Sequence, residues 1–241
     1  MYFVFMEDYR FSLLKEYEKY LSVEEIDRMG KFVLQIDRDQ YLLTRVMARR
    51  ILSQKLGEHF STLVFENNLY GKPYLKNDSK RFSFNISHAA GLIVLAIDDN
   101  AATIGVDVEN LSSEVDLNVR ENVFSNEELL LFEQVPWVDQ KKYFFDLWTL
   151  KESYMKAIGK GFSVAPKSCS FLLEHGKYQF YENVMESAPN EFSFQLFDLD
   201  PCYKVALCHK NENNEINSFR ILPYWEVIDY KMSSGSYILN I

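Results

Sequence analysis

The stretch Phe145-Asp-Leu-Trp-Thr-Leu-Lys-Glu-Ser-Tyr-Met-Lys-Ala-Ile-Gly-Lys-Gly161 has the pattern of a helix that ends at a glycine. No proline interrupts it, and Gly159 falls where a residue of positive φ commonly ends a helix. We therefore predict a helix from about residue 141 to residue 158. Trp148, Glu152 and Lys156 are spaced four apart and share one face of it, with Lys151 one position off that line.

Glu152 and Lys156 allow two interpretations at this point. They could form an ordinary surface ion pair, which would contribute only about 0.3–0.5 kcal/mol. They could instead be functional groups, because a carboxylate and a lysine on an apolar, aromatic-rich helix need an explanation.

Upstream of this helix, Thr103-Ile-Gly-Val-Asp-Val-Glu109 has the pattern of a strand. Side chains alternate along a strand, so Asp107 and Glu109 share one face at about 6–7 Å, while Val106 and Val108 point the other way. Two neighbouring carboxylates repel each other unless a cation lies between them. Mg²⁺ commonly takes one or two carboxylates together with waters and substrate phosphates. The alternative is an exposed acidic strand end.

Helices and strands are predicted along the whole chain. Ser22 with Glu25 and Ser125 with Glu128 form capping-box patterns, the second opening a helix through Phe132. Strands are expected at 1–6, 60–65, 92–97, 103–109, 168–173, 177–181, 192–197, 203–208 and 219–223, with 92–97 and 103–109 paired as a hairpin. Helices followed by strands recur in both halves, so we expect a boundary near residues 100–110.

A further helix is predicted from about residue 39 to residue 56, ending at Gly57. Arg38, Arg45 and Arg49 lie in or beside it, which is a dense group of cations for an acidic chain. The group is either a solvated basic face or a site for an anion.

Composition restricts the function classes. The chain has 241 residues, of which 47% are hydrophobic, and its net charge of −9 argues against general binding to nucleic acid or to an anionic membrane. An anionic ligand would therefore need locally clustered cations. No apolar run approaches the roughly 20 residues that span a bilayer, and the start lacks the basic region of a signal peptide. Three cysteines without a metal-binding spacing predict reduced thiols and a cytoplasmic protein.

Four stretches together resemble one family. Their order and spacing are similar to those of the Sfp (surfactin)-type 4′-phosphopantetheinyl transferases: Gly71-Lys-Pro73, Phe84-Asn-Ile-Ser-His88, Ile104-Gly-Val-Asp-Val-Glu109 and Trp148-Thr-Leu-Lys-Glu-Ser-Tyr-Met-Lys156. Phe124-Ser-x-x-Glu128 and Gly159-Lys-Gly161 add to the match, which covers residues 38–161.

The resemblance implies an α/β (α+β) fold, a pseudo-dimer of two similar halves. Each half would be a small, mostly antiparallel sheet packed with helices, with the active site at their interface. We expect residues 1–103 to form a coenzyme A-binding half and 104–224 a half with the metal site and the catalytic helix, followed by a tail at 225–241. Two covalently joined halves favour a monomer.

The resemblance also implies the reaction: phosphopantetheine moves from coenzyme A to a serine of an apo acyl or peptidyl carrier protein, with Mg²⁺, releasing 3′,5′-ADP. It implies metal binding by Asp107, Glu109 and Glu152, and catalysis by Glu152, Lys156 and Lys151. The residues expected to bind coenzyme A are Lys72, Ser87, His88, Lys156, Arg38, Arg45 and Arg49. Residues 111–124 are a candidate surface for the carrier protein.

Two other functions are considered. One is a non-catalytic module that binds coenzyme A or a carrier protein on the same fold. The other is a different Mg²⁺ enzyme acting on phosphodiesters, such as a nuclease, which the net charge of −9 disfavours. The residues do not distinguish fatty-acid, polyketide and nonribosomal-peptide carriers.

Overall fold

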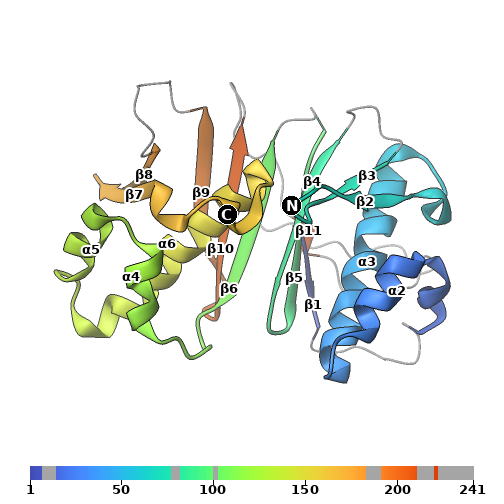
Figure 1. Ribbon diagram of the computed structural model, residues 1–241, viewed down its shortest axis with the longest axis horizontal. Coiled ribbons are helices and arrows are strands. Elements are labelled where there is room, and N and C mark those ends of the chain that lie inside the picture. Colours follow the sequence, from blue (N-terminus) through green and yellow to red (C-terminus); the bar gives the residue numbers. More distant parts are fainter. Residues whose placement is uncertain (7–14, 77–81, 100–102, 183–190, 211–219, 222–241) are drawn as a thin grey trace.

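The computed structural model shows two sheets side by side, each packed against one long helix (Figure 1). It describes residues 1–6, 15–76, 82–99, 103–182, 191–210 and 220–221, so the expected tail at 225–241 lies outside the described residues. Within these ranges, no helix has both the length and the apolar character needed to cross a membrane.

The first half contains a four-stranded sheet in the order β11-β1-β5-β4. Its strands are β1 (Tyr2–Phe5), β4 (Ser83–Ala89), β5 (Leu92–Asp98) and β11 (Arg220–Ile221). β5 pairs antiparallel with β1 and β4, while β11 returns from late in the chain to pair parallel with β1. One face of this sheet packs on α3 (Gln35–Leu56). α2 (Val23–Gly30), β2 (Phe65–Asn67), β3 (Pro73–Leu75) and the 3₁₀ turns η1 (Lys15–Tyr20) and η2 (Phe60–Thr62) complete the half.

The second half repeats this arrangement around a three-stranded antiparallel sheet in the order β6-β10-β9. Its strands are β6 (Ile104–Asn110), β9 (Phe192–Leu199) and β10 (Tyr203–Lys210), and α6 (Trp137–Ile158) packs against them. Around α6 lie α4 (Arg120–Val123), α5 (Asn126–Phe132), the hairpin of β7 (Cys169–Glu174) and β8 (Lys177–Glu182), and the 3₁₀ turns η3 (Leu117–Val119), η4 (Gly161–Ser163) and η5 (Pro166–Ser168).

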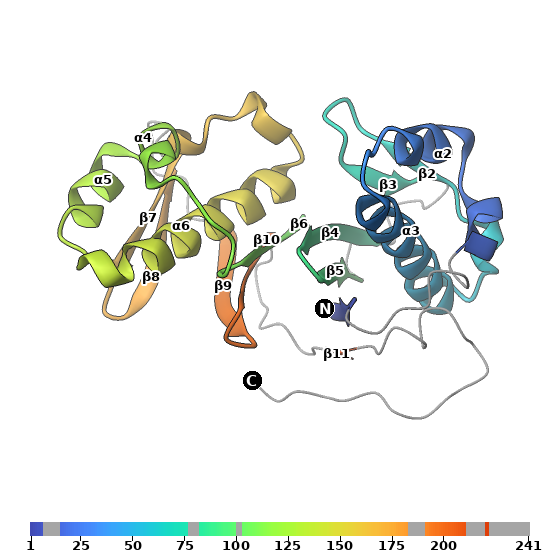
Figure 2. The same ribbon diagram turned by 90° about the horizontal axis from the view of Figure 1, so that it is seen from below.

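β5 is buried on both faces: one face packs on α3, and the other contributes to an apolar core that the two halves share. Ile93 and Leu95 point toward α3, whereas Leu92 and Val94 point into a core with Val106 and other residues of the second sheet. The alternation of a strand thus places successive side chains in two different cores. Figure 2 shows the result, with β6 beside β4 where the two halves meet.

The expected fold of two similar α/β halves is confirmed, and each half has a 22-residue helix that ends at a glycine of positive φ, Gly57 or Gly159. Both capping boxes are also confirmed, with Ser22 and Ser125 as the N-caps. α3 and α6 begin four residues earlier than predicted, at Gln35 and at Trp137 rather than at about 39 and 141.

Two expectations were wrong. The segment 60–65 is not a strand: it begins as the 3₁₀ turn η2, with the His59 side chain accepting a bond from the Ser61 amide, and only Phe65 enters a strand. β5 and β6 do not form a hairpin, because β6 pairs with β10 and β5 with β1 and β4. Both strands are apolar because their side chains meet in the core that the two halves share.

Candidate active site

Gly105 brings β6 against the helix α6. A Cβ at this position would lie 2.1 Å from the Ser153 carbonyl oxygen and 2.3 Å from the Ala157 amide nitrogen. Such distances are far inside van der Waals contact, so only glycine allows the strand and helix to approach this closely. The polar face of β6 therefore lies directly under the face of α6 that carries Glu152 and Lys156.

Lys156, Asp107 and Ser87 form a compact polar cluster where the halves meet. The Lys156 ammonium donates to Asp107 Oδ1 at 2.6 Å and to Ser87 Oγ at 2.8 Å. Ser87, from β4 of the first half, in turn donates to Asp107 Oδ1 at 2.9 Å. Three residues far apart in sequence are thus joined, and Lys156 pairs with Asp107 instead of forming the surface pair with Glu152.

Trp148 lies on the same face of α6 as Lys156, two turns toward the N-terminus, and contacts Glu109 of β6. Its indole Nε1 donates to Glu109 Oε1 at 2.7 Å. Trp148, Glu152 and Lys156 therefore face Glu109 and Asp107, as the spacing of four along the helix and two along the strand predicts.

The carboxyl groups of Glu109 and Glu152 lie where their ionised form is disfavoured, so their pKa values are raised. Burial is the first cause that raises the pKa of each to about 7, and repulsion from Asp107 is the second. The positive charge of Lys156 lowers both pKa values and offsets part of this effect. The site therefore holds more negative charge than its own cation neutralises.

Two oxygen atoms of this site are buried without a partner, Asp107 Oδ2 and Glu152 Oε1. Buried carboxylate oxygens normally have a hydrogen bond or a cation, so these two are available to a ligand. In the part of the chain that the structure describes, no three His, Cys, Asp or Glu side chains form a ready-made metal group. The fit to a divalent cation rests on the oxygen donors and the uncompensated charge.

A cavity of about 350 Å³ opens beside this cluster and is lined by both halves. Its cations are Arg28, Lys72 and Lys156, with the imidazole of His88 alongside, and its described lining contains no carboxylate. A chain of net charge −9 thus has a locally positive cavity, which is the condition that an anionic ligand requires.

His88 and Lys72, both expected near phosphates, line this cavity but differ in their contacts. The His88 ring is solvent-accessible, yet surrounding protein atoms, followed by the Lys156 charge, lower its pKa, which favours the neutral imidazole. The Lys72 ammonium donates to the carbonyls of Ala157 at 2.9 Å and Ile104 at 3.0 Å. Burial lowers the pKa of Lys72 to about 8.

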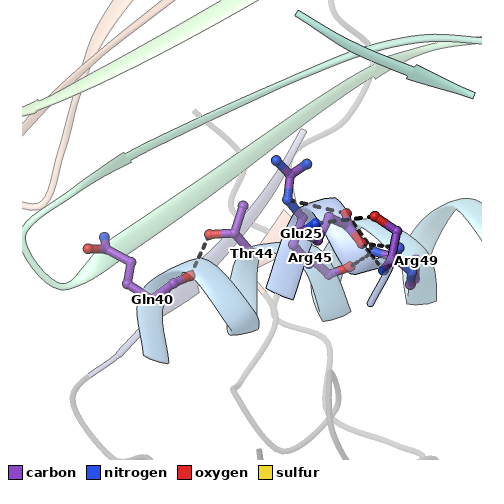
Figure 3. A network of polar contacts seen from close by, with 6 residues as sticks. Glu25, Gln40, Thr44, Arg45 and Arg49 are labelled. Carbon is purple, nitrogen blue, oxygen red and sulfur yellow. Dashed lines mark hydrogen bonds and ion pairs between the residues drawn. The ribbon is translucent and has the colours of Figure 1, made fainter. Parts of the chain in front are cut away.

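The structure does not bring Arg38, Arg45 or Arg49 to this cavity. Arg49 is 3% exposed and forms an ion pair with Glu25 at 2.6 Å, and Arg45 approaches the same carboxylate at 3.5 Å (Figure 3). Arg38 donates to the Phe32 carbonyl at 2.8 Å. Arg45 instead lines a second cavity of about 490 Å³ beside α2, and Arg28 lines both cavities.

Lys151 also lies away from the cavity. Its side chain is 0% exposed and forms an ion pair with Glu128 at 2.8 Å. It also donates to the carbonyls of Pro166 and Cys169, so its ammonium holds α6 to the segment that leads into β7. The other Glu128 oxygen accepts the Phe171 amide at 2.7 Å. We infer a structural position for Lys151, in place of contact with substrate.

Several cavity residues were not predicted as site residues from the sequence, among them Arg28, Tyr70 and Asn85. Arg28 lies in the last turn of α2, and Asn85 bonds the Val106 amide across the two halves at 2.9 Å. Asn85 and Tyr70 sit inside or next to matched motifs, which was an available signal. Nothing local distinguishes Arg28 from the other arginines, since only the packing of α2 brings it to the cavity.

Two family models match the chain. One described as "4'-phosphopantetheinyl transferase superfamily" matches residues 103–208, and one described as "4'-phosphopantetheinyl transferase, N-terminal" matches residues 12–100. A solved holo-(acyl-carrier-protein) synthase from Bacillus anthracis, in complex with CoA (3',5'-ADP), is 17% identical, with a TM-score of 0.39 over 45% of this chain and 95% of that chain.

Two relatives match about four fifths of the chain. The chain is 30% identical over 195 residues to 4'-phosphopantetheinyl transferase psf-1 of Bacillus pumilus, which covers 81% of each protein. It is 28% identical over 194 residues to 4'-phosphopantetheinyl transferase Sfp of Bacillus subtilis (strain 168), covering 80% of this chain and 84% of that relative. This protein belongs to the 4'-phosphopantetheinyl transferase family.

Proposed function

We propose that this protein transfers 4′-phosphopantetheine from coenzyme A to a serine of an apo acyl or peptidyl carrier protein and releases 3′,5′-ADP. The observation that carries the proposal is the acidic cluster of Asp107, Glu109 and Glu152 beside a positively charged cavity between the halves. Coenzyme A has a pyrophosphate and a 3′-phosphate, so its anionic end suits that cavity.

The same acidic cluster is suited to Mg²⁺. Asp107, Glu109 and Glu152 would hold the ion, and the partnerless oxygens of Asp107 and Glu152 are the supporting observation. When bound, Mg²⁺ would stabilise the negative charge of the pyrophosphate during transfer.

The remaining steps belong to side chains of the protein. The carrier serine Oγ attacks the phosphorus that bears the pantetheine arm, and the bond from that phosphorus to the oxygen of the leaving 3′,5′-ADP breaks. Glu152 is the proposed base that takes the serine proton. Lys156, 29% exposed at the cavity, stabilises the charge that develops on the phosphate oxygens, and Ser87 holds its ammonium in place.

Residues of both halves would contact coenzyme A, because both line the cavity. We propose that His88, Ser87 and Lys156 face the phosphates and that Arg28 supplies the cation expected from Arg38, Arg45 and Arg49. Arg28 is an exposed residue of the cavity lining, whereas the Arg45 and Arg49 side chains are turned to Glu25.

The carrier protein would dock on the second half, near the predicted surface at 111–124. The fold narrows that surface, because Val123 and Phe124 are buried at 6% and 0% exposure while Val119 is 40% exposed. Residues 111–122, which are exposed or half-buried, are therefore the part of this segment that can contact a partner.

The test is a transfer assay. The protein, coenzyme A and Mg²⁺ are incubated with apo acyl and peptidyl carriers, and mass spectrometry should detect one phosphopantetheine group on the carrier serine. Absence of a mass gain with every carrier class would count against the proposal. Coenzyme A binding without transfer would support the non-catalytic module instead.

Metal dependence needs a separate measurement. Titration calorimetry should detect Mg²⁺ binding to the wild-type protein in the presence of coenzyme A and not to the Asp107→Asn variant. Equal Mg²⁺ binding by both proteins would exclude Asp107 as a ligand.

A further inference from the structure

The turn between β2 and β3 contacts the C-terminal end of α6, although the two lie in different halves. The Asn68 side-chain amide donates to the Gly159 carbonyl at 2.7 Å. Lys72 Nζ donates to the carbonyls of Ala157 at 2.9 Å and Ile104 at 3.0 Å. Two side chains of the first half therefore bind three backbone carbonyls of the second.

Two of the three carbonyls, those of Ala157 and Gly159, lie at the C-terminal end of α6, and the Ile104 carbonyl begins β6. The last carbonyls of a helix have no partner within the helix and carry its partial negative charge, so an ammonium group there is stabilising. Asn68 also organises the turn, because its Oδ1 accepts the amides of Tyr70 and Lys72, each at 2.9 Å. The approach is close: a Cβ on Gly159 would lie 3.0 Å from Lys72 Cδ and 3.3 Å from Asn68 Nδ2.

The contact joins two walls of the cavity. Residues 70–73 line one side, and Met155, Lys156, Gly159 and Gly161 line the other. The bonds from Asn68 and Lys72 connect these two walls.

We propose that Asn68 and Lys72 form a clasp that sets the width of the coenzyme A cavity by tying the turn 68–73 to the end of α6. Lys72 is accordingly a positioning residue and not a phosphate ligand. This inference rests on the proposed function in one respect, namely that coenzyme A occupies this cavity.

The two roles of Lys72 predict different behaviour. A phosphate ligand acts through its charge on the bound anion, so its loss lowers affinity and also weakens the dependence of affinity on salt. A clasp acts on the protein before the ligand arrives, so its loss loosens both wall segments in the ligand-free state. Asn68 has no charge, and only the clasp predicts that its removal has the same effect.

The experiment compares Asn68→Ala, Lys72→Met and, as a matched control, Lys76→Met. Lys76 is an exposed lysine of the same segment and pairs with Glu66. Amide hydrogen exchange is measured on the ligand-free proteins, and coenzyme A affinity is measured by calorimetry at several salt concentrations.

The clasp predicts faster exchange at 68–73 and 157–161 in both Asn68→Ala and Lys72→Met. It also predicts an affinity for coenzyme A about tenfold weaker in both variants, equivalent to about 1.4 kcal/mol. In Asn68→Ala, which removes no charge, the salt dependence should be unchanged. In the transfer assay the KM for coenzyme A should rise while kcat and the KM for the carrier stay within about twofold, which separates positioning from general loss of folded protein. Lys76→Met should match the wild type.

Unchanged exchange in both variants would overturn the clasp. So would a Lys72→Met variant with a reduced salt dependence and an Asn68→Ala variant that binds normally, because that pair of results identifies a phosphate ligand. Hydrogen exchange needs no turnover, so a wild-type protein without transfer activity would refute the proposed function and still leave the clasp testable.

Discussion

Two lysines of α6 occupy opposite environments because they project from different faces of the helix. Lys156 faces β6 and remains 29% exposed at the cavity, where it contacts Asp107 and Ser87. Lys151 faces η5 and β7 and is completely buried against Glu128. The same residue type therefore contributes charge to the cavity in one case and holds the helix in place in the other.

Glu152→Gln is predicted to abolish transfer and leave coenzyme A binding measurable. The amide keeps the size of the side chain but cannot accept the serine proton, and loss of a general base lowers a rate by about 10²–10⁴-fold. Initial rates with an apo carrier and a binding titration with coenzyme A test this. Glu133→Gln, an exposed site on the same half, is the control and should keep wild-type activity. Equal activity in Glu152→Gln would remove Glu152 from the mechanism.

At the scale of elements, the contact of β6 with α6 determines the site. Gly105 permits that contact, and the alternation of β6 then directs Val106 and Val108 to the shared core and Asp107 and Glu109 to the helix. One small residue thus brings Asp107 and Glu109 of a strand under Glu152 and Lys156 of a helix.

Gly105→Ala is predicted to destabilise the fold by about 3 kcal/mol or more, because the added methyl group collides with backbone atoms that cannot move aside. Thermal unfolding should show a much lower Tm, and transfer activity should fall as α6 shifts. Gly30→Ala is the matched control: a Cβ there meets nothing within 4 Å, at the end of α2. That variant should be as stable as the wild type or slightly more stable.

The Glu128–Lys151 pair should behave as a buried ion pair. Removing one partner leaves the other charge buried, which typically costs about 3–5 kcal/mol. Lys151→Met and Glu128→Gln should therefore each lower the free energy of unfolding in urea by that amount, and the double variant should be more stable than the sum predicts. Lys31→Met, which removes the exposed pair with Asp27, should change stability by less than about 1 kcal/mol. Strict additivity in the double variant would contradict the pairing.

At the scale of the whole molecule, the shared core makes the two halves one structural unit. β4 and β5 of the first sheet pack on β6 of the second, and polar bonds from Asn85 and Ser87 cross between the halves. The cavity lies between parts whose relative position is fixed by both apolar and polar contacts.

Lys72 should make the stability of the whole molecule depend on pH in the alkaline range. Its pKa is about 8 in the folded protein, lowered by burial from its usual 10.5. Between these values the unfolded chain binds the proton and the folded protein does not, so stability rises as pH increases through this window. The gain is at most about 3 kcal/mol, since one pKa unit corresponds to about 1.4 kcal/mol.

Urea unfolding at pH 8 and pH 10.5 tests this prediction. The wild type should gain stability relative to Lys72→Met between the two pH values, whereas Lys76→Met should follow the wild type. A constant difference between wild type and Lys72→Met would show that the Lys72 pKa is not lowered.

Local sequence determined the parts of this protein that depend on near neighbours. Both capping boxes, the glycine end of α6 and the faces shared by Trp148 with Glu152 and by Asp107 with Glu109 follow from fixed helical and strand periodicity. The motifs also indicated the family and its chemistry, because the residues that carry a reaction are few and regularly spaced.

Only the tertiary structure decided which charges reach the site. Lys151, Arg45 and Arg49 have the sequence character of ligands, but each is paired with a buried glutamate, whereas Arg28 reaches the cavity. The pairing of β6 with β10, in place of a hairpin with β5, likewise depends on residues about a hundred positions away. A charged side chain is bound by whichever partner the packing brings to it, and periodicity carries no information about distant partners.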